Sequence, residues 1–227
     1  MKLALIKGHL KDAVTAAVGA VAENRSLPIL KNILISTENG TIALVATNLE
    51  IAIRAALPGK VMEEGSVTVP AATLLQMVNN LTSERIGLEV KNNVLEVTTD
   101  TYSATIQGMS AEDFPIIPAI KNERGNLKIK GILLKEALSQ TAVAAQPSEL
   151  RPELASILFF FALESLKLVA TDSFRLAEKT IVKTQFSTTY KESFKFLLPL
   201  KTAHELIRLL SDEEEVTFRD DGSQIVF

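Results

Sequence analysis

LVATNLEIAI (residues 44–53) and LVATDSFRLA (residues 168–177) are two versions of one phrase, and they lie 124 positions apart in a chain of 227 residues. The same separation of 124 positions links three more pairs of residues: Leu10 with Leu134, Pro28 with Pro152, and Leu34 with Leu158. Similarity that keeps one register over such a length is typical of a duplicated structural unit. The sequence therefore predicts two copies of one fold in tandem.

The separation between the two copies grows slightly toward their ends. VPAATLLQMVNNL in the first copy matches LPLKTAHELIRLL in the second, and the two prolines, Pro70 and Pro199, lie 129 positions apart. Loops at the surface of a protein accept insertions of this size. We therefore place two domains at residues 1–121 and 122–227.

The second copy is shorter than the first. RIGLEVKNNVLEV matches EVTFRDDGSQIVF at a separation of 130, which sets Phe227 opposite Val97. The first copy nevertheless continues through TTDTYSATIQGMSAEDFP (residues 98–115). Because a sheet that is cut short exposes unpaired backbone edges, we expect domain two to be C-terminally incomplete and the chain to be a fragment of a longer protein.

Hydrophobic periodicity predicts the same order of elements in each copy. KLALIKG alternates as a strand, LKDAVTAAVGAVA from Leu10 has helical spacing, and three alternating strands follow. A further strand, a helix with Pro70 in its first turn and three more strands complete the first copy. Two hairpin turns are predicted at Asn39-Gly40 and Asn92-Asn93. The fold class is therefore α+β: each domain has two helices packed on antiparallel sheets of about eight strands in all.

Composition excludes several classes of function. Hydrophobic residues make up 47% of the chain, the net charge is −3, and there is no cysteine, so disulfides and thiolate metal sites are excluded. Two histidines, His9 and His204, are too few for a histidine-rich centre, and the sequence has no phosphate-binding or dinucleotide-binding glycine motif. We expect no metal and no cofactor. No apolar run reaches the roughly 18 residues of a membrane span, so we expect a cytoplasmic protein without membrane contact.

Several phrases together resemble the bacterial DNA polymerase III beta subunit family, the replicative sliding clamps. They are NRSLPILKNILI, LVATNLEIAI, VTVPAATLLQMV and EDFP in the first copy, and ELRPELASILFFF, LVATDSFRLA and LPLKTAHELIRLL in the second. The resemblance implies a non-catalytic processivity factor of three such domains per subunit. Two subunits would close head to tail, through edge strands such as residues 94–107, into a homodimeric ring around duplex DNA. This chain would supply domain one and most of domain two, with the third domain absent.

A ring that slides must contact phosphates without reading bases, so it needs basic residues toward the DNA. Seven candidates lie on or beside the predicted helices: Lys11, Arg25, Lys31, Lys135, Arg151, Lys201 and Arg208. The resemblance points most closely to Arg25, as a loop arginine near the hole, and to Lys201, at the start of an inner helix. The alternative for each residue alone is an ordinary solvated charge. The helix AATLLQMVNNL has no basic residue, which weakens the expectation for domain one.

The two versions of the opening phrase share Leu-Val-Ala-Thr followed by Asn or Asp. This shared part predicts a strand that ends in a turn, with a side chain that bonds nearby backbone. The resemblance implies that the second version belongs to a hydrophobic pocket for short linear motifs of the DNA polymerase, the clamp loader and repair proteins. The pocket residues would be Leu154, Thr171, Ser173, Phe174, Arg175 and Leu176.

Two features of this pocket depart from the family. Ser173 and Phe174 stand where the family usually has Gly-His, so we expect a bulkier rim. The remaining wall would lie beyond Phe227, so we expect this chain to bind such peptides weakly. The alternative for the whole stretch is a core strand that carries one surface arginine.

Two other classes of function remain open at this stage. An enzyme could combine Ser173, Asp172 and His204, but the sequence lacks a nucleophile-elbow pattern and places His204 in a helix. A scaffold built from two repeats could bind proteins without ever encircling DNA. The scaffold would keep the fold and the pocket while lacking a basic face.

Overall fold

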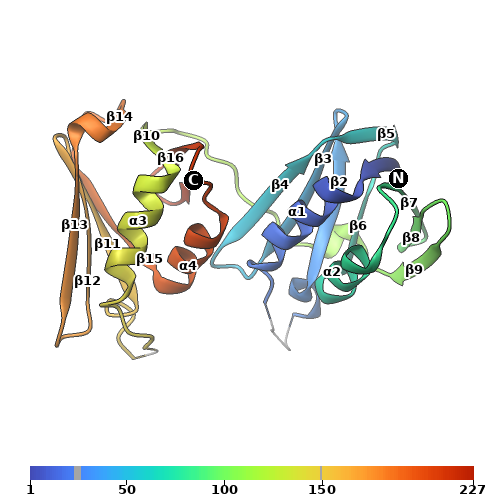
Figure 1. Ribbon diagram of the computed structural model, residues 1–227, viewed down its shortest axis with the longest axis horizontal. Coiled ribbons are helices and arrows are strands. Elements are labelled where there is room, and N and C mark those ends of the chain that lie inside the picture. Colours follow the sequence, from blue (N-terminus) through green and yellow to red (C-terminus); the bar gives the residue numbers. More distant parts are fainter. Residues whose placement is uncertain (23–26, 149) are drawn as a thin grey trace. The chain divides into compact units, whose positions relative to one another are not determined.

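The computed structural model describes residues 1–22, 27–148 and 150–227. The chain divides into two compact units, unit one (Met1–Ile117) and unit two (Pro118–Phe227). Each unit combines two helices with antiparallel sheets (Figure 1). The predicted α+β class and the duplicated plan are thereby confirmed.

Unit one forms two antiparallel sheets with strand orders β5-β1-β7-β8-β9 and β4-β3-β2-β6. Its helices are α1 (Lys7–Val18) and α2 (Ala71–Asn80), with 3-10 turns η1 (Pro28–Lys31) and η2 (Ala111–Asp113). Its strands are β1 (Lys2–Ile6), β2 (Asn32–Glu38), β3 (Thr41–Thr47), β4 (Ala52–Leu57), β5 (Gly59–Glu63), β6 (Ser66–Pro70), β7 (Arg85–Lys91), β8 (Val94–Thr98) and β9 (Ser103–Gln107).

Unit two repeats this plan with sheets β14-β10-β16-β17 and β13-β12-β11-β15. Its helices are α3 (Gly131–Ala142) and α4 (Leu200–Leu209), with a 3-10 turn η3 (Lys183–Gln185). Its strands are β10 (Gly125–Lys130), β11 (Ser156–Ala162), β12 (Ser165–Thr171), β13 (Leu176–Val182), β14 (Phe186–Thr188), β15 (Phe194–Pro199), β16 (Glu215–Asp220) and β17 (Ile225–Val226). In the part of unit two that the structure describes, no fifth strand lies beyond β17 as β9 lies beyond β8.

The bounds of the elements repeat with the separations seen in the sequence. Helices α1 and α3 both have 12 residues and start 124 positions apart, and the same separation relates β2 to β11 and β3 to β12. Helices α2 and α4 both have 10 residues and start 129 positions apart. The duplication is therefore a repeat of structure element by element.

Some predicted bounds were wrong by a few residues. The helix predicted from Leu10 begins at Lys7, because its first turn carries exposed Gly8 and His9 and shows no apolar pattern. Pro70 is the residue before α2 and not its first helical residue, and Pro199 has the same place before α4. Both prolines also end a strand, so each marks a sharp strand-to-helix junction.

Two short strands, β5 and β14, were not predicted. Strand β5 lies at the edge of its sheet and is largely exposed along its length, so it lacks the alternation of apolar and polar residues that identifies a half-buried strand. The predicted hairpin turns are confirmed, because Asn39 and Gly40 have φ of 50° and 74°, and Asn92 and Asn93 have φ of 49° and 61°. Positive φ at both central residues is the condition for a type I′ turn.

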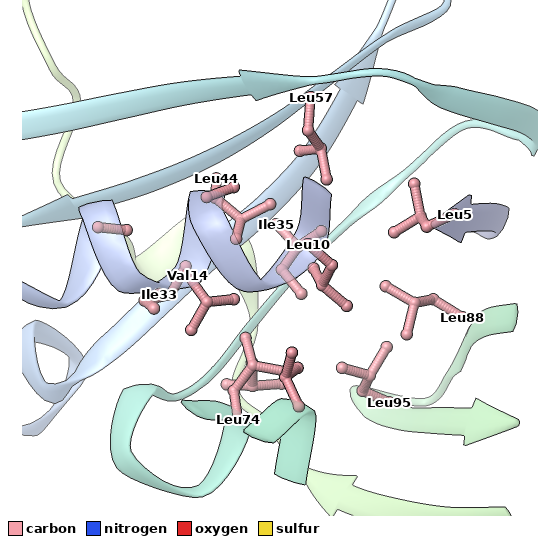
Figure 2. Close-up of a cluster of buried hydrophobic side chains, with 14 of the residues drawn as sticks. Leu5, Leu10, Val14, Ile33, Ile35, Leu44, Leu57, Leu74, Leu88 and Leu95 are labelled. Atoms are coloured by element: carbon pink, nitrogen blue, oxygen red, sulfur yellow. The ribbon is translucent and has the colours of Figure 1, made fainter. Parts of the chain in front are cut away.

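The core of unit one lies between its helices and its two sheets. Figure 2 shows Leu10 and Val14 of α1 and Leu74 of α2 meeting Leu44 of one sheet and Leu88 of the other. All five are at most 1% exposed. Burial of one such side chain contributes about 1.5–3 kcal/mol, so this shared core holds the helices on the sheets.

Candidate functional site

The second version of the repeated phrase forms the end of β12 and the connection from β12 to β13. The carboxylate Oδ1 of Asp172 accepts the backbone N–H groups of Phe174 at 2.9 Å and of Arg175 at 2.7 Å. The hydroxyl of Thr171 donates to the carbonyl oxygen of Arg175 at 2.6 Å and accepts the N–H of Ser173 at 3.1 Å. Two side chains therefore fix the backbone of this loop, which we call the 172–175 loop.

The first version of the phrase builds the same loop. The side-chain oxygen of Asn48 accepts the N–H groups of Glu50 and Ile51, both at 2.9 Å. Thr47 donates to the carbonyl oxygen of Ile51 at 2.8 Å and accepts the N–H of Leu49 at 3.0 Å. The shared residues thus have a structural role, as predicted, because each of these four hydrogen bonds to the backbone of one loop has its counterpart in the other.

Both loops contain a residue in the left-handed region of backbone space. Ser173 has φ of 78°, and Leu49, at the matching position, has φ of 75°. This conformation costs a residue with a Cβ about 1–2 kcal/mol, whereas glycine adopts it freely. Glycine would therefore fit either position without this cost.

Replacing Leu49 with glycine is expected to stabilise unit one by about 1 kcal/mol, because it removes this strain. Leu49 is 59% exposed, so little packing is lost. Thermal unfolding of the Leu49→Gly chain should show a midpoint about 4 °C higher. Leu49→Ala is the matched control, since alanine keeps its Cβ; an equal gain with alanine would contradict the strain argument.

The two loops differ in the side chains that they present. Phe174 is 95% exposed and Leu176 is 68% exposed, whereas Glu50 and Ala52 stand at the matching positions of unit one. An exposed aromatic ring beside an exposed leucine offers apolar surface that a partner can cover. The second loop therefore differs from the first in the property that a partner would detect.

Arg175 is exposed but held in place. Its Nε and Nη2 atoms each lie 2.9 Å from Oδ2 of Asp172. The two backbone N–H bonds to Asp172, and then the Arg175 side chain, lower the pKa of this carboxyl group from 3.8 to about 2. Because Asp172 holds the guanidinium group of Arg175 through Nε and Nη2, the rest of that group is presented to a ligand at a fixed position.

Acid is expected to lower the stability of unit two through protonation of Asp172. Because the pKa of Asp172 is lower in the folded state than the unfolded value of 3.8, its stabilisation is complete above about pH 4. The stabilisation is lost as the pH falls toward 2. In Asp172→Asn, which copies Asn48, the unfolding midpoint should depend less on pH between 5 and 2. An unchanged dependence would show that other carboxyl groups control acid unfolding.

The sheet brings Leu154 to the same end as the 172–175 loop. Strand β11 pairs with β12 in the register Leu158 with Val169, so the start of β11 lies beside the end of β12. Leu154 precedes β11, is partly buried, and accepts the N–H of Gln146 at 3.0 Å through its carbonyl oxygen. Six predicted pocket residues therefore share one end of one sheet: Leu154, Thr171, Ser173, Phe174, Arg175 and Leu176.

The predicted DNA-contacting residues differ in their surroundings. Lys11 on α1, Lys31 at the end of η1 and Lys201 on α4 are exposed. Three others have acidic partners: Lys135 with Asp212 at 3.0 Å, Arg151 with Glu153 at 3.0 Å, and Arg208 with Glu205 at 2.7 Å. Arg25 lies outside the described residues.

Helix α4 carries its basic residues in one row. Lys201, His204 and Arg208 follow the i, i+3, i+7 spacing of a single helix face, and all three are exposed. His204 was missed as a member of this row, although the spacing in the sequence could have shown it. At the matching positions α2 has only uncharged residues: Ala72, Leu75 and Asn79.

The groups considered for catalysis are used otherwise. Both carboxylate oxygens of Asp172 accept hydrogen bonds, one from the loop backbone and the other from Arg175. His204 is exposed on α4. Within the ranges that the structure describes, no three His, Cys, Asp or Glu side chains gather as metal ligands. Among the described helices, none has the length and apolar character needed to cross a membrane.

Comparisons with known proteins agree with this architecture. Residues 1–118 match the family model of the DNA polymerase III beta subunit N-terminal domain, and residues 128–225 match the model of its central domain. Beta sliding clamps of Chlamydia pneumoniae and Bacillus subtilis are 28% and 26% identical over 99% and 95% of this chain. The chain spans 61% and 58% of the length of these two relatives.

Solved structures show the same fold. The DNA polymerase III beta subunit of Thermotoga maritima superposes with a TM-score of 0.88 at 27% identity, covering 99% of this chain and 60% of the other. The sliding clamp of Bacillus subtilis gives a TM-score of 0.92 at 24% identity over 99% of this chain and 61% of its own. The duplicated sheets, the matched loops and the two family models lead to one conclusion: the chain belongs to the DNA polymerase III beta subunit family and carries its N-terminal and central domains.

Proposed function

We propose that this chain is part of a DNA sliding clamp, a non-catalytic processivity factor that acts in the cytoplasm. The clamp would encircle duplex DNA independently of sequence and tether the DNA polymerase, the clamp loader and repair proteins. The observation that carries the DNA part is the exposed row of Lys201, His204 and Arg208 on α4. Lys201 and Arg208 on one helix face, with His204 between them, suit phosphates, which carry no sequence information.

The other DNA contacts would come from Lys11, Lys31, Lys135 and Arg151, with Arg25 as a further candidate. Two of them, Lys135 and Arg151, hold exposed acidic partners. Exposed ion pairs are worth about 0–1 kcal/mol, so a phosphate can displace the carboxylate. These contacts would be weak and mobile, as sliding requires.

The 172–175 loop would hold the peptides. Phe174 and Leu176 supply exposed apolar surface, Arg175 supplies a charge held by Asp172, and Thr171, Ser173 and Leu154 complete this end of the sheet. A few anchors of this kind suit a short linear motif. The Helicobacter pylori beta clamp, 22% identical with a TM-score of 0.85, was solved bound to a DNA ligase peptide, so a protein of this fold can hold a peptide.

We further propose that domain one ends and domain two begins near Lys121, between the two family matches. The relatives are longer than this chain, which covers 61% of the Chlamydia pneumoniae protein. A homodimeric ring would need a third domain from that additional length, and the rest of the peptide pocket would come from it.

A scaffold that binds proteins without encircling DNA is the second candidate. The uncharged exposed face of α2 favours it, since a DNA-facing helix should carry basic residues.

The test is retention on circular DNA. The complete natural protein, loaded onto a nicked circular plasmid by its clamp loader and ATP, should stay bound in high salt and leave when the plasmid is cut, because a ring is held by topology and not by charge. The same protein added without loader is the control. Equal loss from circular and linear DNA would contradict the clamp and favour the scaffold.

A further inference from the structure

Unit one has an open groove on the outer face of the sheet β5-β1-β7-β8-β9. The groove has a volume of about 560 Å³ and lies over β1, β5, β7 and the end of β8. Ala4, Gly87 and Thr98 are paired in one row across β1, β7 and β8, and the residues next to them, Leu5 and Ile86, are buried in the core. Neighbouring strands lie about 4.8 Å apart, so these small residues form a floor about 10 Å wide.

Three basic side chains from three different elements surround this floor. Lys60 lies on β5 opposite Ala4, His9 lies in the first turn of α1, and Arg85 of β7 is paired with Ile6, the residue directly before α1. His9 and Arg85 therefore share one end of the groove. All three basic side chains are exposed, and among the described residues none of them has a hydrogen-bond or ion-pair partner.

The charge of the groove is positive, although the chain as a whole has a net charge of −3. Among the described residues that line the groove, one is acidic: Asp100. Lys60 and Arg85 against Asp100 leave a net charge of +1, which becomes +2 when His9 is protonated. A phosphate ester carries a charge of about −1.5 to −2 at pH 7. Its charge therefore matches that of the groove more closely than the charge of a single carboxylate does.

Unit two fills the matching place in its own sheet. The separations of 124 and 130 set Lys128 at the position of Ala4, and Glu215 at the position of Arg85. The carboxylate of Glu215 lies 3.7 Å from Nζ of Lys128. Unit two thus places a long side chain on the floor and pairs its charge. Within the described ranges, the duplication keeps the sheet, but only unit one keeps this floor small and its basic residues unpaired.

The place of the groove within its sheet favours a small ligand over a peptide. Strands β1 and β7 lie inside the strand order β5-β1-β7-β8-β9, so neighbouring strands already pair with them on both sides. A peptide laid over the floor would find no strand edge to which it could add its backbone. A volume of about 560 Å³ is in the range of small-molecule sites, which combine apolar surface with a few convergent polar groups.

We propose that this groove binds a phosphate ester joined to a flat ring, a ligand of the size of a mononucleotide. Arg85 and His9 bind the phosphate, and Lys60 adds positive charge from β5. The ring lies on the floor at Ala4 and Gly87. Arginine suits this role because its planar group donates two parallel hydrogen bonds to phosphate. The proposal does not depend on the 172–175 loop, on α4 or on closure of a ring.

The test is a titration of the isotope-labelled chain with adenosine monophosphate, followed by NMR. The backbone amides of Ala4, Gly87 and Thr98 should shift, whereas those of Lys128 and Thr217 at the matching places of unit two should not. Adenosine supplies the ring alone and inorganic phosphate supplies the anion alone, so each should bind about tenfold more weakly. A triglutamate peptide represents an acidic peptide and should bind no better than inorganic phosphate.

Four variants test the residues. Arg85→Gln should weaken binding of adenosine monophosphate about tenfold or more, because it removes a charged hydrogen bond. Arg54→Gln is the matched control, on exposed β4 of the other sheet, and should leave the affinity unchanged. Ala4→Lys with Arg85→Glu copies the ion pair of unit two and should abolish binding. Asp100→Asn should tighten binding about two- to threefold, a gain that misfolding cannot produce.

Three results would overturn the proposal. The first is that adenosine monophosphate leaves the amides of the floor unmoved. The second is that inorganic phosphate binds as tightly as adenosine monophosphate, or that triglutamate binds more tightly. The third is that Arg85→Gln and Arg54→Gln bind adenosine monophosphate with equal affinity.

Discussion

The Lys201→Ala and Arg208→Ala double variant is expected to bind double-stranded DNA about tenfold more weakly at low salt. Each phosphate contact releases counterions, and losing two contacts should reduce the slope of log affinity against log salt by about 2. Fluorescence anisotropy with a labelled duplex at several salt concentrations measures both quantities. The fold should be unaffected, since both side chains are exposed on α4.

Lys191→Ala with Lys195→Ala is the matched control. It removes the same charge from exposed positions in and before β15 and leaves the residues of α4 unchanged. If only the net charge of the chain mattered, the two double variants would weaken binding equally. That outcome would contradict a DNA-facing row on α4, and so would an unchanged salt slope in the Lys201 and Arg208 variant.

Peptide binding should depend most strongly on Phe174 and Arg175. The double variant Phe174→Ala with Arg175→Ala is expected to weaken binding of a clamp-binding peptide, such as the DNA ligase peptide of a related clamp, by about 30-fold or more. The loop backbone should survive, because the N–H bonds to Asp172 and Thr171 do not use these side chains. Calorimetric titration of the complete protein measures the affinity.

Glu50→Ala is the control for this variant, since Glu50 has the position of Phe174 in the matching loop of unit one. It should leave the peptide affinity unchanged. Crosslinking of the dimer should be equal in all variants, which shows that the ring is intact. An affinity for the peptide equal to that of the unchanged protein would remove the 172–175 loop from the site.

Much of the fold could be predicted because the sequence contains two copies of the same structural unit. Each copy supports the other, so an ambiguous stretch in one is resolved by its partner at a separation of 124 or 129 positions. The edge strand β5 was not predicted, because an exposed strand has no alternation of apolar and polar residues. The first turn of α1 was not predicted for the same reason, since Gly8 and His9 are exposed.

The candidate sites were less visible. Thr171 and Asp172 could be assigned to the loop backbone from residue type alone, because short polar side chains bond nearby backbone. The pairing of Lys135 with Asp212 could not be predicted, because residues 77 positions apart are brought together only by the packing of the fold. Glu205 and Arg208, by contrast, have the i, i+3 spacing of an ion pair on a helix. The membership of His204 in the row on α4 follows from helical spacing once the helix is known.

By itself the sequence determined the duplication, the α+β class, the hairpin turns and the difference between the two versions of the repeated phrase. These properties depend on periodicity, on turn residues and on similarity within the chain, which are local or repeated and so can be read along it. Only the tertiary structure decided that Phe114 packs with Ile29 and Val45 on the outer face of one sheet of unit one. Burial of a sheet face depends on segments far apart in the chain, and no local pattern encodes which of them meet.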